Sequence, residues 1–244
     1  MTLSAQEASS LSTRGLTKSW LTCPTRRRPP HEPNCLIQTE WDLTPISLRV
    51  QGEREGKSAM TLVVRPARPD DATAIARVQV ATWRTTYRGI VPDEYLDSME
   101  EEPRARYGRD VTSRDAEAAG KPFVVVAEDT GRGVVGFAAA GPERRGDPHF
   151  CGELEAIYIL QEYQRQGIGR RLVREVVQRL LQRGFNTMLV WVLAENPYRR
   201  FYEALGGSVL CSEQLTIGGK TLGKRAYGWD DIRHLAGTPA HASK

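Results

Sequence analysis

The stretch "QRQGIGRR", Gln164 to Arg171, places two glycines where a helix is expected to begin. Its two glycines, Gly167 and Gly169, stand two residues apart between arginines, and an apolar helical pattern follows them. Glycine weakens a helix, so this pair indicates either a tight turn or a place where a ligand approaches the backbone closely. A helix start offers free N–H groups and the positive end of the helix dipole, which suit an anion.

Three better-known glycine motifs do not fit the chain. The dinucleotide fingerprint G-x-G-x-x-G fails because Leu172 stands at its third glycine. A Walker loop around "GKT" (Gly219 to Thr221) fails because Gln214 stands where its first glycine belongs. The hydrolase elbow G-x-S-x-G fails at Leu210. From the residues alone, an anion site and a turn that binds nothing both stay open.

Composition indicates an ordinary globular chain. Of its 244 residues, 40% are hydrophobic and 26% are charged. The net charge of +4 comes without an aromatic-rich basic stripe, so we expect no nucleic-acid partner. No apolar run approaches the roughly 20 residues that span a bilayer, so we expect no membrane partner. The cysteines form no Cys-x-x-Cys pair, which favours a reducing, cytoplasmic location without a metal site: Cys23, Cys35, Cys151 and Cys211.

Periodicity divides the chain into three parts. Residues 1–59 show no sustained period and are rich in proline, so we expect a disordered or loosely structured extension. Regular patterns begin after Met60, and we hypothesise that the native protein starts there. Residues 60–235 are expected to form one domain, followed by a tail at 236–244.

Within that domain, strand and helix patterns alternate. The predicted order is strand, two helices, three strands, helix, strand, helix, two strands, which is an α/β sheet with parallel and antiparallel pairs. The run 187–193 is apolar on both faces and predicts a central strand. The other predicted strands are 61–66, 122–129, 134–141, 153–160, 208–217 and 224–229. The predicted helices begin near Asp70, within 87–99, after Gly167 and at Tyr198.

At this point the residues resemble a family. Gln164 to Gly169 is similar to the Q/R-x-x-G-x-G/A signature of the GNAT superfamily of acetyl-CoA-dependent N-acetyltransferases. "RPARPDDATAIARVQVATW" (Arg65 to Trp83) resembles the family's first strand and helix, and "ENPYRRFYEALGG" (Glu195 to Gly207) resembles its F-Y-E-x-x-G element. The resemblance covers Met60 to Leu235 and implies a mixed central sheet of about six to seven strands with helices on both faces.

The resemblance implies that acetyl-CoA binds as the acetyl donor. Its pyrophosphate would lie on the helix start, where a Cβ at either glycine would meet the phosphates. The residues implied there are Gln164, Arg165, Gln166, Gly167, Ile168, Gly169 and Arg170. In the family, the fourth and fifth strands splay apart, and free backbone groups of Ile157, Tyr158 and Ile159 would face the cofactor. One of these N–H groups can donate to the thioester oxygen as it becomes negative. Asn196 is similar to a cofactor-bonding asparagine, although it could instead cap the next helix.

The resemblance also implies catalytic roles. Tyr202 matches the family's general acid, which protonates the leaving sulfur; its alternative role is core packing beside Phe201. Glu153 lies where some members carry a catalytic glutamate. Glu155, on the same side of the strand, could also act as the base, directly or through a water, and His149 is a third candidate. The two carboxylates could instead line a pocket for a cationic amine.

The acceptor would lie against the first two helices and the last hairpin. Plausible lining residues are Trp83, Tyr87, Glu94 and Tyr95, although these aromatics could simply pack the helix pair. We therefore expect an N-acetyltransferase that acts on a small-molecule or protein amine by direct attack. A non-catalytic acyl-CoA-binding regulatory or partner domain is the alternative. The sequence leaves the oligomeric state open, a homodimer included.

Overall fold

The structure, a computed structural model, describes residues 61–112 and 120–237. The predicted extension 1–59 and residues 238–244 of the predicted tail lie outside the described residues. The last described element, the 3-10 helix η4, ends at Ala236, one residue beyond the predicted end of the domain.

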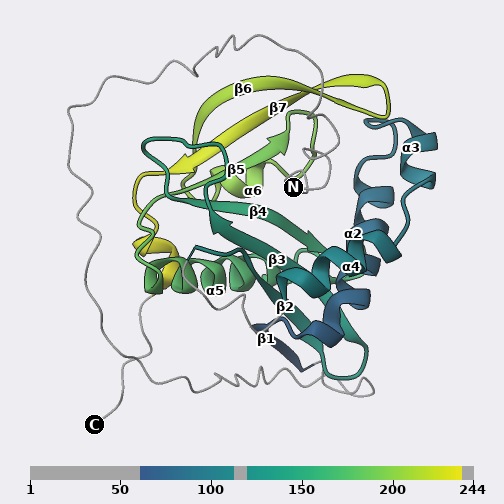
Figure 1. Cartoon of the computed structure of the whole chain (residues 1–244), viewed down its shortest axis with the longest axis horizontal. Coiled ribbons are helices and arrows are strands. Elements are labelled where there is room, and N and C mark those ends of the chain that lie inside the picture. The colour runs from purple at the N-terminus through teal and green to yellow at the C-terminus, as the bar shows by residue number, and fades with distance from the viewer. Residues whose placement is uncertain (1–60, 113–119, 238–244) are drawn as a thin grey trace.

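A seven-stranded sheet in the order β1-β2-β3-β4-β5-β7-β6 organises the described chain (Figure 1). Neighbouring strands pair antiparallel except β4 and β5, which pair parallel. This confirms the expected mixed sheet. The strands are β1 Leu62–Pro66, β2 Phe123–Asp129, β3 Gly133–Pro142, β4 Gly152–Ile159, β5 Met188–Leu193, β6 Ser208–Ile217 and β7 Lys220–Trp229.

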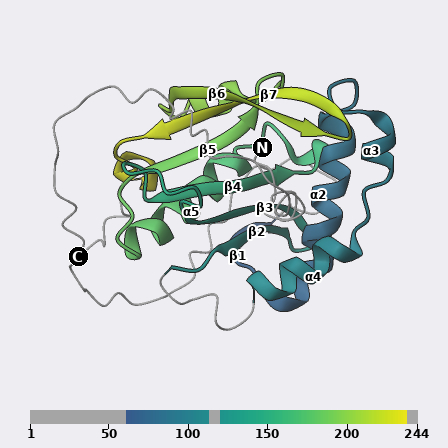
Figure 2. The same ribbon diagram turned by 45° about the horizontal axis from the view of Figure 1, so that its top comes forward.

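Helices cover both faces of the sheet. The apolar stripe of α5 packs on one face with Met188, Val190 and Val192 of β5. The stripe of α2 packs on the other face with Tyr158 of β4. Figure 2 shows α2 and α4 side by side, and α3 beside the turn of the β6–β7 hairpin. The α-helices are α2 Ala72–Thr86, α3 Asp93–Asp97, α4 Glu102–Val111, α5 Ile168–Gln182 and α6 Arg200–Glu203, and the 3-10 helices are η1 Pro69–Asp71, η3 Gln161–Tyr163 and η4 Arg233–Ala236.

Two sequence-based expectations about these elements were wrong. Within residues 61–112 and 120–122, three α-helices lie between β1 and β2, where two were predicted; α4 escaped the prediction because it is rich in charged residues and has few apolar ones. It contacts α2 through small residues instead, and a Cβ added at Gly108 would lie 3.4 Å from the Cβ of Ala72. Strand β7 begins at Lys220 rather than 224, since the turn needs only Gly218 and Gly219, both with positive φ.

The parallel pair β4–β5 is very short. It joins only Gly152 to Met188 and Glu153 to Leu189, and further along the two strands separate. On its other side, β4 pairs Leu154 with Ala140 and Ala156 with Ala139, so Glu155 forms a bulge. The splayed strands that the resemblance implied are therefore confirmed, and they open the middle of the sheet.

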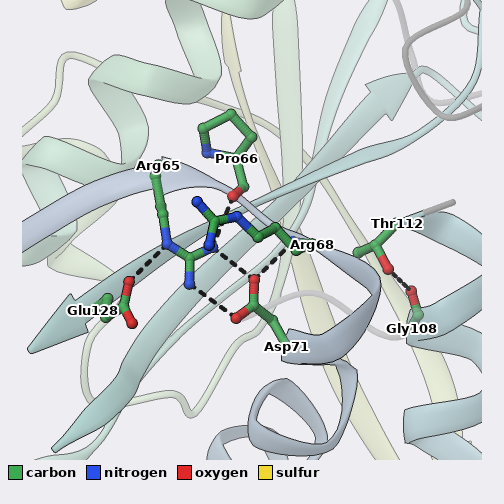
Figure 3. A network of polar contacts seen from close by, with 7 residues as sticks. All are labelled: Arg65, Pro66, Arg68, Asp71, Gly108, Thr112 and Glu128. Carbon is green, nitrogen blue, oxygen red and sulfur yellow. Dashed lines mark hydrogen bonds and ion pairs between the residues drawn. The ribbon is translucent and has the colours of Figure 1, made fainter. Parts of the chain in front are cut away.

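An ion-pair network ties the first strand to the sheet and to the start of α2 (Figure 3). The Arg65 guanidinium donates to both oxygens of Asp71 at 2.7 and 2.9 Å, and to Glu128 of β2 at 2.7 Å. Asp71 also accepts from the Arg68 N–H at 2.7 Å. One arginine thus links β1, β2 and η1.

Candidate functional site

The start of α5 is built to receive an anion. Gly167 has a φ of 80°, and nothing lies within 4 Å of the position that a Cβ would take there. The first helical hydrogen bond runs from the Arg171 N–H to the Gly167 carbonyl at 3.2 Å, so the N–H groups of residues 167–170 have no helical partner. No side chain caps them. Arg165, which adopts an unusual φ of 62°, and Arg170 are exposed beside them.

The two glycines of the signature serve different purposes. A Cβ at Gly169 would lie 3.2 Å from two atoms of the Phe201 ring, which belongs to α6. At Gly169 the structure thus adds a contact that the sequence did not predict, because a Cβ there would crowd the protein's own Phe201. At Gly167 the backbone conformation itself demands glycine.

The polar side chains around this turn mostly bind the protein itself. Gln164 donates to the Ile159 carbonyl at 3.0 Å, and Gln166 donates to the Glu162 carbonyl at 3.0 Å. Arg171 donates to the Leu62 carbonyl at 2.8 Å, and burial lowers its pKa. Arg171 thus fastens α5 to β1, whereas Arg165 and Arg170 remain the exposed charges at the helix start.

The edge of β4 that faces the opening carries backbone groups without a strand partner in β5. The Leu160 N–H donates to Val135 of β3 at 2.9 Å. Because N–H groups alternate along a strand, those of Ile159 and Ile157 point away from β3, toward the opening, and that of Tyr158 points toward β3. Of the three residues predicted to face a cofactor, alternation places the N–H groups of two beside the opening.

Aromatic residues from α2 and β4 form a buried cluster behind this edge. The Trp83 indole donates to the Tyr158 hydroxyl at 2.9 Å and packs edge-on to Tyr87 at 5.0 Å. Tyr95 of α3 lies 6.3 Å from Trp83, and Glu94 is exposed. These aromatics pack the helix pair and are buried or half-buried.

Asn196 joins this cluster to the start of α6. It is fully buried, donates to the Tyr87 hydroxyl at 3.0 Å and accepts from the Tyr198 N–H at 2.8 Å. The second contact closes an Asx turn that precedes α6. The N-cap of α6 is Arg199 and no side chain caps it, so the capping role that the sequence left open for Asn196 was wrong. The side chain therefore holds Tyr87 and the α6 turn in fixed relation.

Tyr202 of α6 is buried, with Tyr227 of β7 and Tyr158 of β4 nearby. Its ring stacks on Tyr227 of β7 at 5.8 Å and meets Phe201 edge-on at 5.5 Å. Burial raises the pKa of Tyr202 far above its ordinary value, and the nearby phenols Tyr158 and Tyr227 add to this. The phenol consequently stays protonated and able to donate over the whole working pH range.

The two predicted carboxylates lie together, but in different environments. Both oxygens of Glu153 accept from Arg144, at 2.6 and 3.0 Å. Glu155, at the bulge, lies 3.5 Å from the same guanidinium. Burial raises the pKa of Glu155, with Arg144 opposing this and Glu153 adding to it. His149 lies apart on the surface, 2.9 Å from Asp230.

Five charged or aromatic residues close to these carboxylates or to Trp191 escaped the sequence analysis: Arg144, Arg145, Trp191, Glu213 and Lys224. Arg144 and Arg145 reach their partners from the loop after β3, and Lys224 reaches Trp191 because β7 pairs with β5; no local pattern reveals either arrangement. Trp191, a bulky aromatic in an otherwise aliphatic strand, was the one signal available.

Comparison with known proteins shows which family the chain resembles. The model of the Acetyltransferase (GNAT) family matches residues 80–206. The uncharacterized N-acetyltransferase YuaI of Bacillus subtilis (strain 168) is 38% identical over 174 residues, which are 71% of this chain and 96% of that protein.

Solved structures of similar fold include two with the coenzyme bound. The PaiA N-acetyltransferase of Thermoplasma acidophilum in complex with coenzyme A is 22% identical with a TM-score of 0.54, covering 69% of this chain and 100% of that one. The yncA acetyltransferase of Salmonella typhimurium with acetyl-CoA is 19% identical with a TM-score of 0.54, covering 75% and 97%.

The described residues lack two further features. None of their helices has the length and apolar character needed to cross a membrane. Over residues 61–112 and 120–237, no group of three or more His, Cys, Asp and Glu side chains is arranged to hold a metal ion.

Proposed function

Because this chain belongs to the GNAT acetyltransferase family and is an acyltransferase with acetyl-CoA as its donor, we propose that it acetylates a primary amine of a small molecule or protein by direct attack. The observation that carries this proposal is the opening between β4 and β5, with the phenol of Tyr202 and two buried carboxylates on the strands and helix that border it.

The residues around the opening fit the donor. Acetyl-CoA supplies a thioester, whose acetyl group is the one transferred. The N–H groups of residues 167–170, together with the exposed Arg165 and Arg170, would hold the diphosphate. The N–H groups of Ile157 and Ile159 would bind the pantetheine arm along the edge of β4. The open space at Gly167 supports this, since it leaves the backbone accessible.

Tyr202 is proposed as the general acid. Thiolate is the leaving group, and a thiol of pKa about 8.5 leaves more readily when a phenol donates to the sulfur. Burial raises the pKa of Tyr202, which keeps the phenol protonated and so able to act as a donor when the thiolate leaves. Asn196, by holding Tyr87 and the α6 turn, acts as a positioning residue.

A β4 carboxylate is proposed as the base. An amine of pKa about 10 is protonated at neutral pH and must lose a proton before it attacks. Glu153 was the first expectation, and Glu155 the second. The contacts favour Glu155, acting directly or through a water, because Glu153 already binds Arg144 with both oxygens. Burial also raises the pKa of Glu155, which makes it the stronger base.

The activity is tested by thiol release from acetyl-CoA with a panel of amines. We expect turnover with at least one amine. Glu155→Gln should lower kcat/KM by about 10²–10⁴-fold, and Glu153→Gln by less. If acetyl-CoA protects the fold against heat but no amine releases thiol, the chain is a non-catalytic acyl-CoA-binding domain. If Glu153→Gln has the larger effect, Glu153 is the base.

A further inference from the structure

We propose that the acceptor is a zwitterionic amine with a carboxylate close to its amino group, as in a free amino acid, and that Trp191, Lys224 and Arg145 bind this carboxylate. The inference rests on the proposed function, since it concerns the acceptor of the same reaction. It comes from the face of the sheet opposite α5, where Arg145 of the loop after β3 and Lys224 of β7 contact Trp191.

Trp191 stands beside the opening of the sheet. The last paired residues of the two splayed strands are Glu153 and Leu189. Glu155 and Trp191 are each two residues further along, so they stand on the two sides of the opening at a similar level. Leu189 and Trp191 belong to the same small apolar cluster, which also contains Phe150 and Ala226.

Two cations contact the Trp191 ring. The ammonium of Lys224 lies 4.2 Å from the ring centroid, and the Arg145 guanidinium lies 4.9 Å from it. Lys224 also contacts Glu213, its cross-strand neighbour on β6, at 3.2 Å. Arg145 contacts the same carboxylate at 3.0 Å. Glu213 is therefore the one carboxylate within ion-pair distance of both Lys224 and Arg145 among the described residues, and these three side chains together carry a net positive charge.

The opposite side of the opening shows the reverse balance. Arg144 forms its close, two-pronged contact with Glu153 and only a longer one, 3.5 Å, with Glu155. The single positive charge of Arg144 therefore lies between two negative carboxylates. Glu155 is the less fully neutralised of the pair, so an ammonium group would be attracted to it.

The indole N–H of Trp191 supplies an independent indication of a ligand. Trp191 is 8% exposed, and its Nε1 is buried without a hydrogen-bond partner. An unpaired buried donor is costly, and few native side chains leave one unmatched. A carboxylate of the acceptor would satisfy this N–H and place negative charge beside Lys224 and Arg145.

These charges match a zwitterion better than a polyamine. Three cations, Arg144, Arg145 and Lys224, share this face, and a second ammonium group would meet repulsion from Lys224 and Arg145. An amino acid would instead direct its amine toward Glu155 and its carboxylate toward Trp191. Burial, and then the neighbouring Arg145, lower the pKa of Lys224, so an added anion beside Lys224 would be stabilising.

The test compares matched acceptors. Thiol release from acetyl-CoA is measured for the twenty amino acids, for their decarboxylated amines and for spermidine. We expect at least one amino acid to exceed its decarboxylated amine by about 10²-fold in kcat/KM. If decarboxylated amines or spermidine react and the amino acids do not, the inference is wrong while the proposed function holds. If no amine reacts, both fall.

Variants then locate the carboxylate site. Lys224→Met should raise KM for the amino acid by about 10–100-fold, with a smaller effect on its decarboxylated amine. Trp191→Phe keeps the ring and removes only the N–H, so it should raise the same KM by about 10-fold. Arg109→Gln, at an exposed pair on α4, is the matched control and should change neither.

The ratio between the two acceptors keeps this test independent of folding. A variant that is merely unstable loses activity toward both acceptors equally, and its ratio stays at the wild-type value. An unchanged ratio in both Lys224→Met and Trp191→Phe would overturn the assignment of the carboxylate site.

Discussion

Gly167 and Gly169 show how one short motif can combine two physical demands. The backbone at Gly167 has a φ of 80°, which L side chains rarely adopt, and leaves open space for a ligand. At Gly169 the demand comes from the ring of Phe201, which approaches the helix closely. The sequence pattern marks both glycines, but only the structure separates the backbone conformation at Gly167 from the packing at Gly169.

Gly169→Ala should therefore destabilise the protein through Phe201. The new Cβ would lie 3.2 Å from the ring, and overpacking of this kind costs roughly 1–3 kcal/mol. Chemical denaturation measures the free energy of unfolding. Phe201→Leu in the same chain should recover at least about 0.5 kcal/mol in a double-mutant cycle, because the two residues are in contact. Strictly additive effects would contradict this account.

Tyr202→Phe should remove the proton donor while it preserves the packing. The ring still stacks on Tyr227, so we expect the affinity for acetyl-CoA to stay the same and kcat to fall by about 10²–10⁴-fold. Steady-state kinetics and calorimetric binding separate the two effects. Tyr227→Phe is the control, since it loses a hydroxyl bound to Glu203 at 2.9 Å and should leave kcat nearly unchanged. An undiminished kcat in Tyr202→Phe would exclude the phenol from the proton transfer.

At the scale of elements, the sequence predicted those helices and strands whose apolar residues recur with a regular period. The apolar stripes of α2 and α5 are buried, and β5, apolar on both faces, is fully buried between β4 and β7. Helix α4 could not be found in this way, because its contact with α2 uses small residues and its other residues are largely charged. The last strand was expected to begin only at Lys224, whereas the turn takes just Gly218 and Gly219 and β7 pairs with β6 from Lys220 onward.

The residues of the candidate site also differ in whether a local pattern could predict them. The helix-start residues and Tyr202 could be located because a local motif fixes their spacing. Trp191 and Lys224 could not, since their contact requires β5 to pair with β7. Asn196 was located, but its contact with Tyr87 joins residues 109 positions apart.

Arg65 should matter for stability more than an exposed arginine does. It is mostly buried and binds Asp71 and Glu128, and hydrogen bonds to charged groups contribute about 1.5–3 kcal/mol each. Arg65→Met should lower the free energy of unfolding by about 2–4 kcal/mol at pH 7. Arg109→Met, which breaks an exposed pair with Glu102, should cost less than about 0.5 kcal/mol. Equal losses would contradict the argument from burial.

The same network predicts a sign for the pH dependence. Burial alone would raise the pKa of Asp71, but hydrogen bonds from Arg65 and the Arg68 N–H outweigh it and lower the pKa below 3.8. A carboxyl whose pKa is lower in the folded state stabilises above its unfolded pKa, and this stabilisation is lost as the pH falls through the folded value. Arg65→Met should thus lose less stability than wild type between pH 5 and pH 2.

At the scale of the whole molecule, the feature that would make room for a ligand is the short pairing between β4 and β5, which divides the sheet into two groups of strands. Strands β1 to β4 and strands β5 to β7 are joined by two residue pairs, and α5 packs against both groups. The division leaves the backbone edge of β4 available where a continuous sheet would have none. A ligand that lies along this edge would bind both halves and stabilise the folded protein.

Coenzyme A should therefore raise the midpoint of thermal unfolding and protect a defined part of β4. At 100 times its Kd it adds about 2.7 kcal/mol, which corresponds to about 5–10 °C for a domain of this size. Hydrogen exchange of the Ile157 and Ile159 amides should slow by about 10-fold or more, because they point toward the opening. The Leu160 amide already donates to Val135 and should change little. In Gly167→Ala the strained helix start should weaken binding, so the shift at the same concentration should shrink. A full thermal shift with unprotected Ile157 and Ile159 would mean that the coenzyme binds elsewhere than along β4.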